Sequence, residues 1–235
     1  KVPDRRIDVL LENRRRTADT DAALARSVGR AKNVTLGYFF HTSSRDVAHL
    51  TEKEIAADAA LVAGSKYQMI QSSKTTDEDA FIKAYSAVAN LKPLSKAAEN
   101  CGYFNAFPDS DGVIRWAPLV IRFQDNYYSP LSISMLTQYL DWPALPLKIA
   151  EFGIESVILD KYQIPTDEAG RLLINYLGPA KTFPHYSITD VIHKRLSPNL
   201  FKNKIVIVGA TAVGIYDLRV TPFSAVYPGV EIHAT

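Results

Sequence analysis

The first third of the chain alternates amphipathic segments with apolar runs, a pattern that predicts helices between strands. Residues 20–28 carry apolar side chains at helical spacing, so they predict a helix. Asp19 or Thr20 is the candidate N-cap of this helix, and Gly29 is its expected end. The run NVTLGYFF at 33–40 is rich in β-branched and aromatic residues, which predicts a buried strand.

Two more helices are expected before residue 93. Thr51 and Glu54 have the spacing of a capping box, in which each side chain binds the backbone N–H of the other residue. A later helix is expected to begin near Thr76 or Asp77 and to end before Pro93, whose ring disfavours helix at the preceding residue. The apolar residues at helical spacing in that segment are Phe81, Ile82, Tyr85 and Val88.

The middle of the chain has the pattern of an inserted β-hairpin. Two strand-like runs, 101–107 and 113–123, flank the sequence PDSDG at 108–112, which is a strong turn signal. Pro130 stands where a helix accepts proline, at the first turn, and predicts a helix over 131–140. Short strands are further expected at 156–159 and 171–176.

The last sixty residues contain the most apolar run of the chain. Ser187 and Asp190 predict the start of a short helix over 189–196. The sequence KIVIVG at 204–209 is a continuous β-branched run that ends in glycine, which is typical of a parallel strand buried on both faces. Together these elements predict one α/β domain over residues 1–235: a single mixed α/β domain with a largely buried central sheet and an inserted β-hairpin.

Composition narrows the class of protein. The chain has 235 residues, of which 47% are hydrophobic, and a net charge of +2, which argues against a dedicated nucleic-acid binder. Its longest uncharged run, 126–140, is too short and too polar for a membrane span. A single cysteine, Cys101, excludes an internal disulfide. Residues 1–32 hold nine basic and five acidic side chains, a net +4, and Arg14, Arg15 and Arg16 form either an anion-binding site or a solvated loop.

The loop after the 204–209 run resembles a nucleotide-binding loop only in part. A phosphate loop requires Lys and Ser or Thr where this chain has Ile215 and Tyr216, and the dinucleotide fingerprint requires glycine where Thr211 stands. Two alternatives remain for this loop. Its backbone amides could hold an anion, or it is a tight connection between two elements.

Four residues of the same region are candidates for binding a ligand. Open α/β sheets bind ligands at the carboxyl ends of their strands, and Thr211, Asp217, Arg219 and Thr221 follow the 204–209 run. Asp217 could accept hydrogen bonds and Arg219 could hold a carboxylate. Alternatively, Asp217 and Arg219 brace the loop through backbone hydrogen bonds. No set of residues predicts a catalytic site.

No metal or cofactor site is expected. Asp109 and Asp111 resemble part of a calcium loop, but Phe107 and Pro118 replace the required acids, so a turn is favoured. The five histidines have no metal-binding spacing, and the segment with Glu231 and His233 is interpreted as a helix start.

Several blocks of sequence carry a resemblance to a known family. They stand at 102–119 (GYFNAFPDSDGVIRWAPL), 129–132 (SPLS), 173–179 (LINYLGP), 183–184 (FP), 187–192 (SITDVI), 201–223 (FKNKIVIVGATAVGIYDLRVTPF) and 227–234 (YPGVEIHA). In content and order they resemble the CHASE2 domain. The blocks extend from about residue 95 to the end of the chain, whereas residues 1–32 resemble the family poorly.

CHASE2 domains are extracytoplasmic sensor modules of bacterial transmembrane receptors, with nucleotide cyclase, histidine kinase or Ser/Thr kinase outputs in the cytoplasm. The resemblance implies a periplasmic sensor that responds to a small molecule or a protein and is held to the membrane by flanking spans. A homodimer is expected in the full receptor, and this domain is expected to be neither an enzyme nor a nucleic-acid binder and to need no cofactor. The alternative is a soluble α/β enzyme or nucleotide-binding protein that uses the loop from Gly209 to Thr221.

Overall fold

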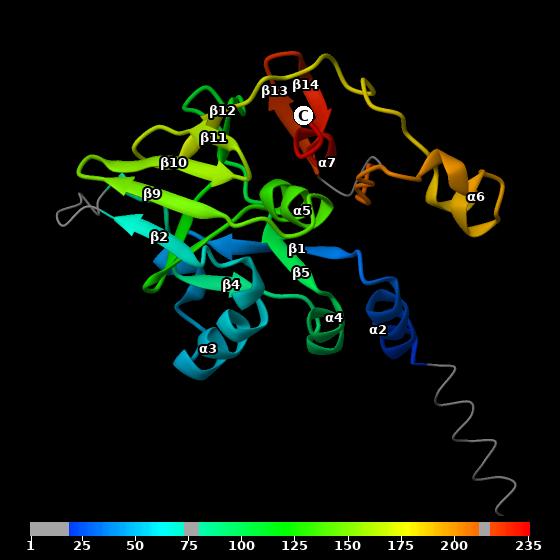
Figure 1. The fold of residues 1–235 in the computed structure, drawn as a ribbon, viewed down its shortest axis with the longest axis horizontal. Helices are drawn as coiled ribbons and strands as arrows, with labels where there is room; N and C mark the ends of the chain where they lie inside the picture. The colour runs from blue at the N-terminus through cyan, green and yellow to red at the C-terminus, as the bar shows by residue number, and fades with distance from the viewer. Residues whose placement is uncertain (1–18, 73–79, 212–216) are drawn as a thin grey trace, which may run out of the picture.

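The computed structural model describes residues 19–72, 80–211 and 217–235 (Figure 1). The helices are α2 Thr20–Ala31, α3 Glu52–Leu61, α4 Lys92–Ala97, α5 Leu131–Tyr139, α6 Ile188–Ile192 and α7 Gly229–Ile232, with 3₁₀ turns η1 Ser44–Val47, η2 Ala63–Ser65 and η4 Pro198–Leu200. The strands are β1 Thr35–His41, β2 Met69–Ser72, β3 Lys83–Ala84, β4 Ser86–Val88, β5 Asn100–Tyr103, β6 Trp116–Pro118, β7 Ile121–Phe123, β8 Asn126–Tyr128, β9 Pro146–Ala150, β10 Gly153–Leu159, β11 Tyr162–Pro165, β12 Arg171–Leu173, β13 Leu218–Thr221 and β14 Ser224–Pro228. They form several small mixed sheets, so the expected α/β class is confirmed.

Strand β1 is the centre of the sheet β4-β1-β5 and confirms the strand predicted at 33–40. It pairs in parallel with β5 and antiparallel with β4. Helices α3 and α4 lie on one side of this sheet and α5 on the other (Figure 1). The core beneath it is aromatic: the Phe40 ring lies within 6 Å of rings from β1, β5, β7 and β8, which belong to Tyr38, Tyr103, Phe123 and Tyr128.

The two helix starts predicted from N-cap residues are confirmed. The Asp19 carboxylate accepts a hydrogen bond from the Ala22 amide at 2.9 Å and caps α2. In α3 both halves of the capping box are present, since the Glu54 amide donates to Thr51 Oγ1 and the Thr51 amide donates to Glu54 Oε2. The predicted end of α2 at Gly29 is wrong. The helix continues to Ala31 and ends at Lys32, which has a left-handed φ of 56°.

Helix α5 confirms the prediction for 131–140, and its position is set by contacts with the sheet. The Asn100 side-chain amide donates to the Ser134 carbonyl at 2.6 Å, and Thr35 Oγ1 donates to Gln138 Oε1 at 2.6 Å. A Cβ atom on Gly102 would lie 2.6 Å from the backbone nitrogen and Cα of Leu131. Helix α5 therefore lies directly on β5 because residue 102 has no side chain.

The second large sheet, β11-β10-β9-β2, packs around a separate aliphatic core. Leu147, Ile154 and Val157 on β9 and β10 have no exposed surface. Strand β10 contains the strand predicted at 156–159. The strand predicted at 171–176 is shorter, because β12 ends at Leu173.

The helix predicted from residue 76 or 77 is wrong. Residues 76–79 lie outside the described residues, and the part that is described forms β3 and β4. Strand β4 pairs with the end of β1, which buries Ser86 and Ala87 and leaves Tyr85 and Val88 partly exposed. The pairing with β1 therefore overrides the helical spacing of the apolar residues.

The predicted β-hairpin around 108–112 is also wrong. The turn exists, since the Asp109 amide donates to the Val113 carbonyl and the Gly112 amide donates to the Asp109 carbonyl. Its two flanking segments do not pair with each other, because β5 pairs with β1 and β6 pairs with β12. The turn is a local signal, whereas the partners of the flanking strands come from distant parts of the chain.

The segment from 185 to 211 differs most from the sequence-based expectation. The helix predicted at 189–196 is present but shorter, because α6 ends at Ile192; it lies away from the sheets in Figure 1. The 204–209 run, predicted to be a buried parallel strand, forms no strand and is largely exposed to solvent. Its exposed fractions reach 51% at Val206 and 79% at Val208. The expectation of a central strand here is therefore wrong for this arrangement, because the run is not paired with any sheet.

Within the described ranges, no helix combines the length and the apolar character that crossing a membrane requires.

Candidate ligand-binding cleft

A large cleft separates the start of β1 from the C-terminal part of the chain. Its walls are residues 33–37, the side chains of α5 that face them, residues 204–209, and residues of β13 and α7. We call it the β1 cleft. Its volume of about 910 Å³ lies at the upper end of the range for small-molecule sites.

The wall on the side of the sheet is apolar. Phe104, which follows β5, and Leu131 of α5 both contact the position of Gly37 on β1. A Cβ atom on Gly37 would lie 2.9 Å from the Phe104 ring, so glycine is needed for the ring to lie against the strand. Met135, one turn further along α5, extends the same wall.

The opposite wall carries the charged groups. Strands β13 and β14 form a hairpin that leads into α7, and the Gly229 amide at the start of α7 donates to the Asp217 carbonyl at 2.8 Å. A Cβ atom on Gly229 would collide with the Asp217 carboxylate. The carboxylate of Asp217 therefore lies against the α7 backbone, at a place that only glycine leaves open.

Asp217 forms an incomplete ion pair with Arg219. One guanidinium nitrogen of Arg219 lies 3.3 Å from Asp217 Oδ1, and both side chains are partly exposed, so the pair contributes little to stability. The other guanidinium N–H groups have no acceptor among the described residues. A bound ligand could therefore use them without first breaking a strong salt bridge.

His233 is the titratable group deepest in this wall. Burial lowers the pKa of its imidazole, Arg219 lowers it further, and Asp217 acts in the opposite direction. The imidazole of His233 is thus held neutral at pH 7, where it can both donate and accept a hydrogen bond.

The four residues predicted to bind a ligand lie in different surroundings. Asp217 and Arg219 line the cleft together. Thr221 is buried at the end of β13, where its hydroxyl donates to the Ser224 carbonyl and accepts from the Ser224 amide, so it holds the hairpin turn. Thr211 is exposed, and residues 212–216 between it and Asp217 lie outside the described residues.

Sequence reasoning missed most of the apolar wall. Phe104, Leu131 and Met135 come from β5 and α5, which the sequence does not place beside Asp217. The signal that could have found them is Gly37 between bulky residues of β1, since glycine inside a strand often marks a close approach of another group.

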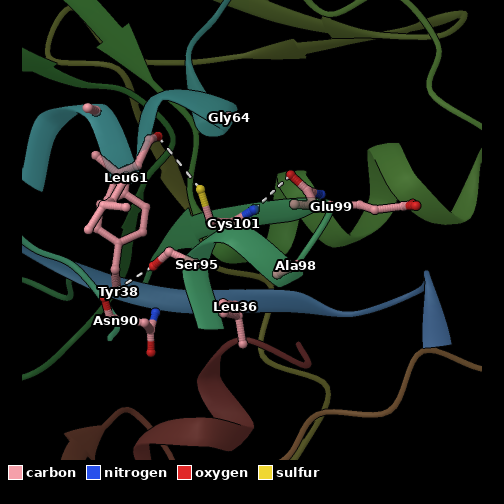
Figure 2. A pocket seen from close by; sticks show the side chains of 12 residues that line it. Leu36, Tyr38, Leu61, Gly64, Asn90, Ser95, Ala98, Glu99 and Cys101 are labelled. Carbon is pink, nitrogen blue, oxygen red and sulfur yellow. Dashed lines mark hydrogen bonds between the residues drawn. The ribbon is translucent and has the colours of Figure 1, made fainter. Parts of the chain in front are cut away.

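A smaller cavity of about 200 Å³ lies on the other face of β1, between α3, α4 and β5 (Figure 2). Figure 2 shows Cys101 beside Gly64 and below the end of α3, where its thiol lies 3.6 Å from the Val62 carbonyl. Burial raises the pKa of this thiol, which keeps it protonated and unreactive. Cys101 is therefore a partly buried residue packed against the aromatic core.

The described residues contain no cluster of histidine, cysteine or acidic side chains that could hold a metal ion. In the turn that resembles a calcium loop, Arg115 binds both Asp109 and Asp111, at 2.8 Å and 2.7 Å. These carboxylates are therefore neutralised by a guanidinium. Glu231 is buried and accepts hydrogen bonds from the amides of Lys181 and Phe183, so it ties the 179–185 loop to α7.

A mixed α/β domain with an open, partly charged cleft has the form of a binding module. A family model described as the CHASE2 domain matches residues 6–235, almost the whole chain. The chain therefore belongs to the CHASE2 family, whose members are extracytoplasmic sensory domains. The match extends much closer to the N-terminus than the sequence blocks that carry the resemblance. Searches of curated proteins and of solved structures found no match.

Proposed function

We propose that this domain is the extracytoplasmic sensor of a bacterial membrane receptor and that it detects its signal in the β1 cleft. The observation that carries the proposal is the cleft itself, in which an apolar wall lies opposite the weakly paired side chains of Asp217 and Arg219. Such a site fits a small organic ligand that has both an apolar part and a charged group. Membership of a sensory family supports the same role.

The cleft is also well placed to convert binding into a change of shape. One wall belongs to β1 and α5, and the other belongs to the segment after residue 200. A ligand that contacts both walls favours the arrangement of the walls that it fits, and shifts the population of the domain toward it. Arg219 would hold an acidic group, Asp217 would accept from a donor, and Thr221 would keep the hairpin in place. Thr211 is proposed as a contact at the rim.

We propose further that flanking membrane spans hold the domain outside the cytoplasm and that the receptor acts as a homodimer. In this scheme a cyclase or kinase output lies on the cytoplasmic side. Full-length receptor variants test it: replacing Asp217 and Arg219 should abolish the response to ligand while the amount of receptor in the membrane is unchanged.

Calorimetric titration tests the binding site directly. The probes are a panel of small aliphatic and aromatic carboxylic acids and amines, with ATP and GTP included. We expect saturable binding of at least one amphipathic acid, weakened about tenfold or more by Arg219→Ala, because a hydrogen bond to a charged group is lost. The matched control is Arg195→Ala, since Arg195 forms an exposed ion pair with Asp190 near α6, outside the cleft.

Two results would overturn this proposal. The first is a ligand whose affinity is the same for wild type and Arg219→Ala. The second is binding of nucleotides alone, which would favour the nucleotide-binding alternative for the loop after Gly209.

A further inference from the structure

One edge of β1 has no strand beside it over its first residues. Strand β5 covers one edge from Thr35 to Tyr38, but on the other edge β4 begins only at Phe39. In the described part of the chain, no strand pairs with residues 35–37 on that second edge. Figure 2 shows α7 lying on this side of β1, opposite β5.

The backbone groups of Thr35 and Gly37 point toward this free edge. Successive residues of a strand direct their N–H and C=O groups to alternate sides. Tyr38 directs its carbonyl to the β5 side, where the Phe104 amide binds it, and His41 directs its carbonyl to the β4 side, where the Tyr85 amide binds it. Odd-numbered residues therefore face the β4 side. At Gly37 the carbonyl on that side accepts from the Asn90 side chain at 2.8 Å, which marks the end of the free edge.

The 204–209 run lies across the β1 cleft from residues 33–37, and it too has no strand partner among the described residues. It is built from Ile205, Val206, Ile207 and Val208, which favour strands, yet no backbone hydrogen bond joins these residues to another described residue. Its apolar side chains are largely exposed. At its end, Gly209 packs on Val230 of α7, where a Cβ atom would lie 2.5 Å from Val230 Cγ2. The run is therefore held against α7 at one end.

We propose that the free edge of β1 is a strand-acceptor site and that its occupant is the 204–209 run of the same chain. Docking would add the run to the sheet beside β1, pair the backbone groups of Thr35 and the Gly37 amide with alternate residues of the run, and bury valine and isoleucine side chains of the run. The open arrangement described above and the docked one are then two states of the domain.

If the β1 cleft binds a ligand, as proposed above, docking of the 204–209 run regulates that binding. The docked run fills the apolar part of the cleft, so a ligand that occupies this space holds the run away from β1. Ligand binding and strand docking exclude each other, which couples the ligand to the connection between α6 and α7.

Hydrogen exchange of the unmodified 235-residue chain tests the docking without any substitution. The two alternate amides among residues 205–208 that face β1 should exchange at least about tenfold more slowly than the same amides in the denatured chain, because paired strand amides are protected. Exchange at the denatured rate would overturn the proposal. Binding measured by calorimetry is a separate result, so a failure of the docking and a failure of the ligand site are distinguishable.

Cysteine cross-linking tests the geometry. In a Cys101→Ser background, Thr35→Cys is combined in turn with Ile205→Cys, Val206→Cys, Ile207→Cys and Val208→Cys. A strand docked on β1 presents alternate residues to one face, so disulfides should form at two alternating positions and not at the other two. Disulfide formation at all four positions or at none would refute the docking. Thermal melting of each variant shows that it is folded.

The size of the cross-linked product identifies the occupant. An intramolecular disulfide supports docking within one chain. Alternating disulfides that join two chains would overturn that assignment and show that the site accepts the run of a second copy.

Discussion

Replacing Gly102 with alanine should destabilise the domain by overpacking the contact between β5 and α5. The new Cβ atom would lie 2.6 Å from Leu131 N and Cα, and 2.8 Å from the carbonyl carbon of Pro130. These are backbone atoms, which cannot rotate away as the end of a flexible side chain can. Helix α5 would have to shift by several tenths of an ångström, and it is also held by the Asn100–Ser134 hydrogen bond.

Overpacking of this kind costs about 1–3 kcal/mol. For a chain of this size, each kcal/mol corresponds to about 2–4 °C in melting temperature, so we expect a decrease of about 2–12 °C. Urea denaturation followed by circular dichroism measures the free energy of unfolding, and a thermal scan measures the shift. Leu131 is part of the apolar wall of the β1 cleft, so the same variant should also weaken binding of an apolar ligand.

Gly64→Ala is the matched control. A Cβ atom there would lie 3.7 Å from Cys101 Sγ, an ordinary contact, and the change should alter the free energy of unfolding by well under 1 kcal/mol. The reasoning is refuted if Gly102→Ala is as stable as wild type, or if the control loses as much stability as Gly102→Ala.

Three further predictions concern single side chains. Burial lowers the pKa of His233, so at pH values between its pKa in the folded chain and about 6.5 the unfolded chain binds more protons than the folded chain. The free energy of unfolding should therefore decrease as the pH falls through this window. In urea titrations at several pH values, His233→Gln should flatten this pH dependence. Tyr38→Phe removes a buried 2.7 Å hydrogen bond to Ser65 and should cost about 0.5–1.5 kcal/mol in urea denaturation. Hydrogen bonds from Arg115 lower the pKa of Asp111 to about 2, and Arg115→Leu should raise it toward the ordinary value in a carboxyl NMR titration.

Each of these has a clear contradictory result. The His233 prediction is wrong if wild type and His233→Gln share one pH profile. An unchanged free energy of unfolding in Tyr38→Phe would show that the hydroxyl pair contributes nothing. A pKa for Asp111 that stays near 2 in Arg115→Leu would assign the shift to the Val113 amide, which also binds this carboxylate at 3.1 Å.

Features set by neighbours in the chain could be predicted from the sequence. The capping box at Thr51 and the start of α5 after Pro130 depend on residues within one helical turn, and both predictions are confirmed. The strand predicted at 33–40 is likewise confirmed, because its aromatic and β-branched residues suit a buried position whichever strand pairs with it.

Features set by distant partners could not be predicted. Residues 81–88 have helical spacing, but β1 supplies a strand partner that no local pattern reveals. The candidate cleft shows the same division. Asp217 and Arg219 stand close together in the sequence and line the cleft together, whereas Phe104 and Leu131 reach it only because β5 pairs with β1. The strand character of 204–209 is a property of its residues, and the sequence alone does not determine whether the run is docked.

The parallel pairing of β1 with β5 has a consequence for the order of events during synthesis. Thr35 is paired with Asn100, 65 residues later in the chain, and a ribosome working at about 5–20 residues per second takes about 3–13 s to supply that partner. The 204–209 run follows Thr35 by about 170 residues, so the free edge of β1 is exposed to other strands for about 8–34 s before its proposed occupant is made. Strand β1 is therefore a segment on which a holding chaperone would have several seconds to act before its partners are made.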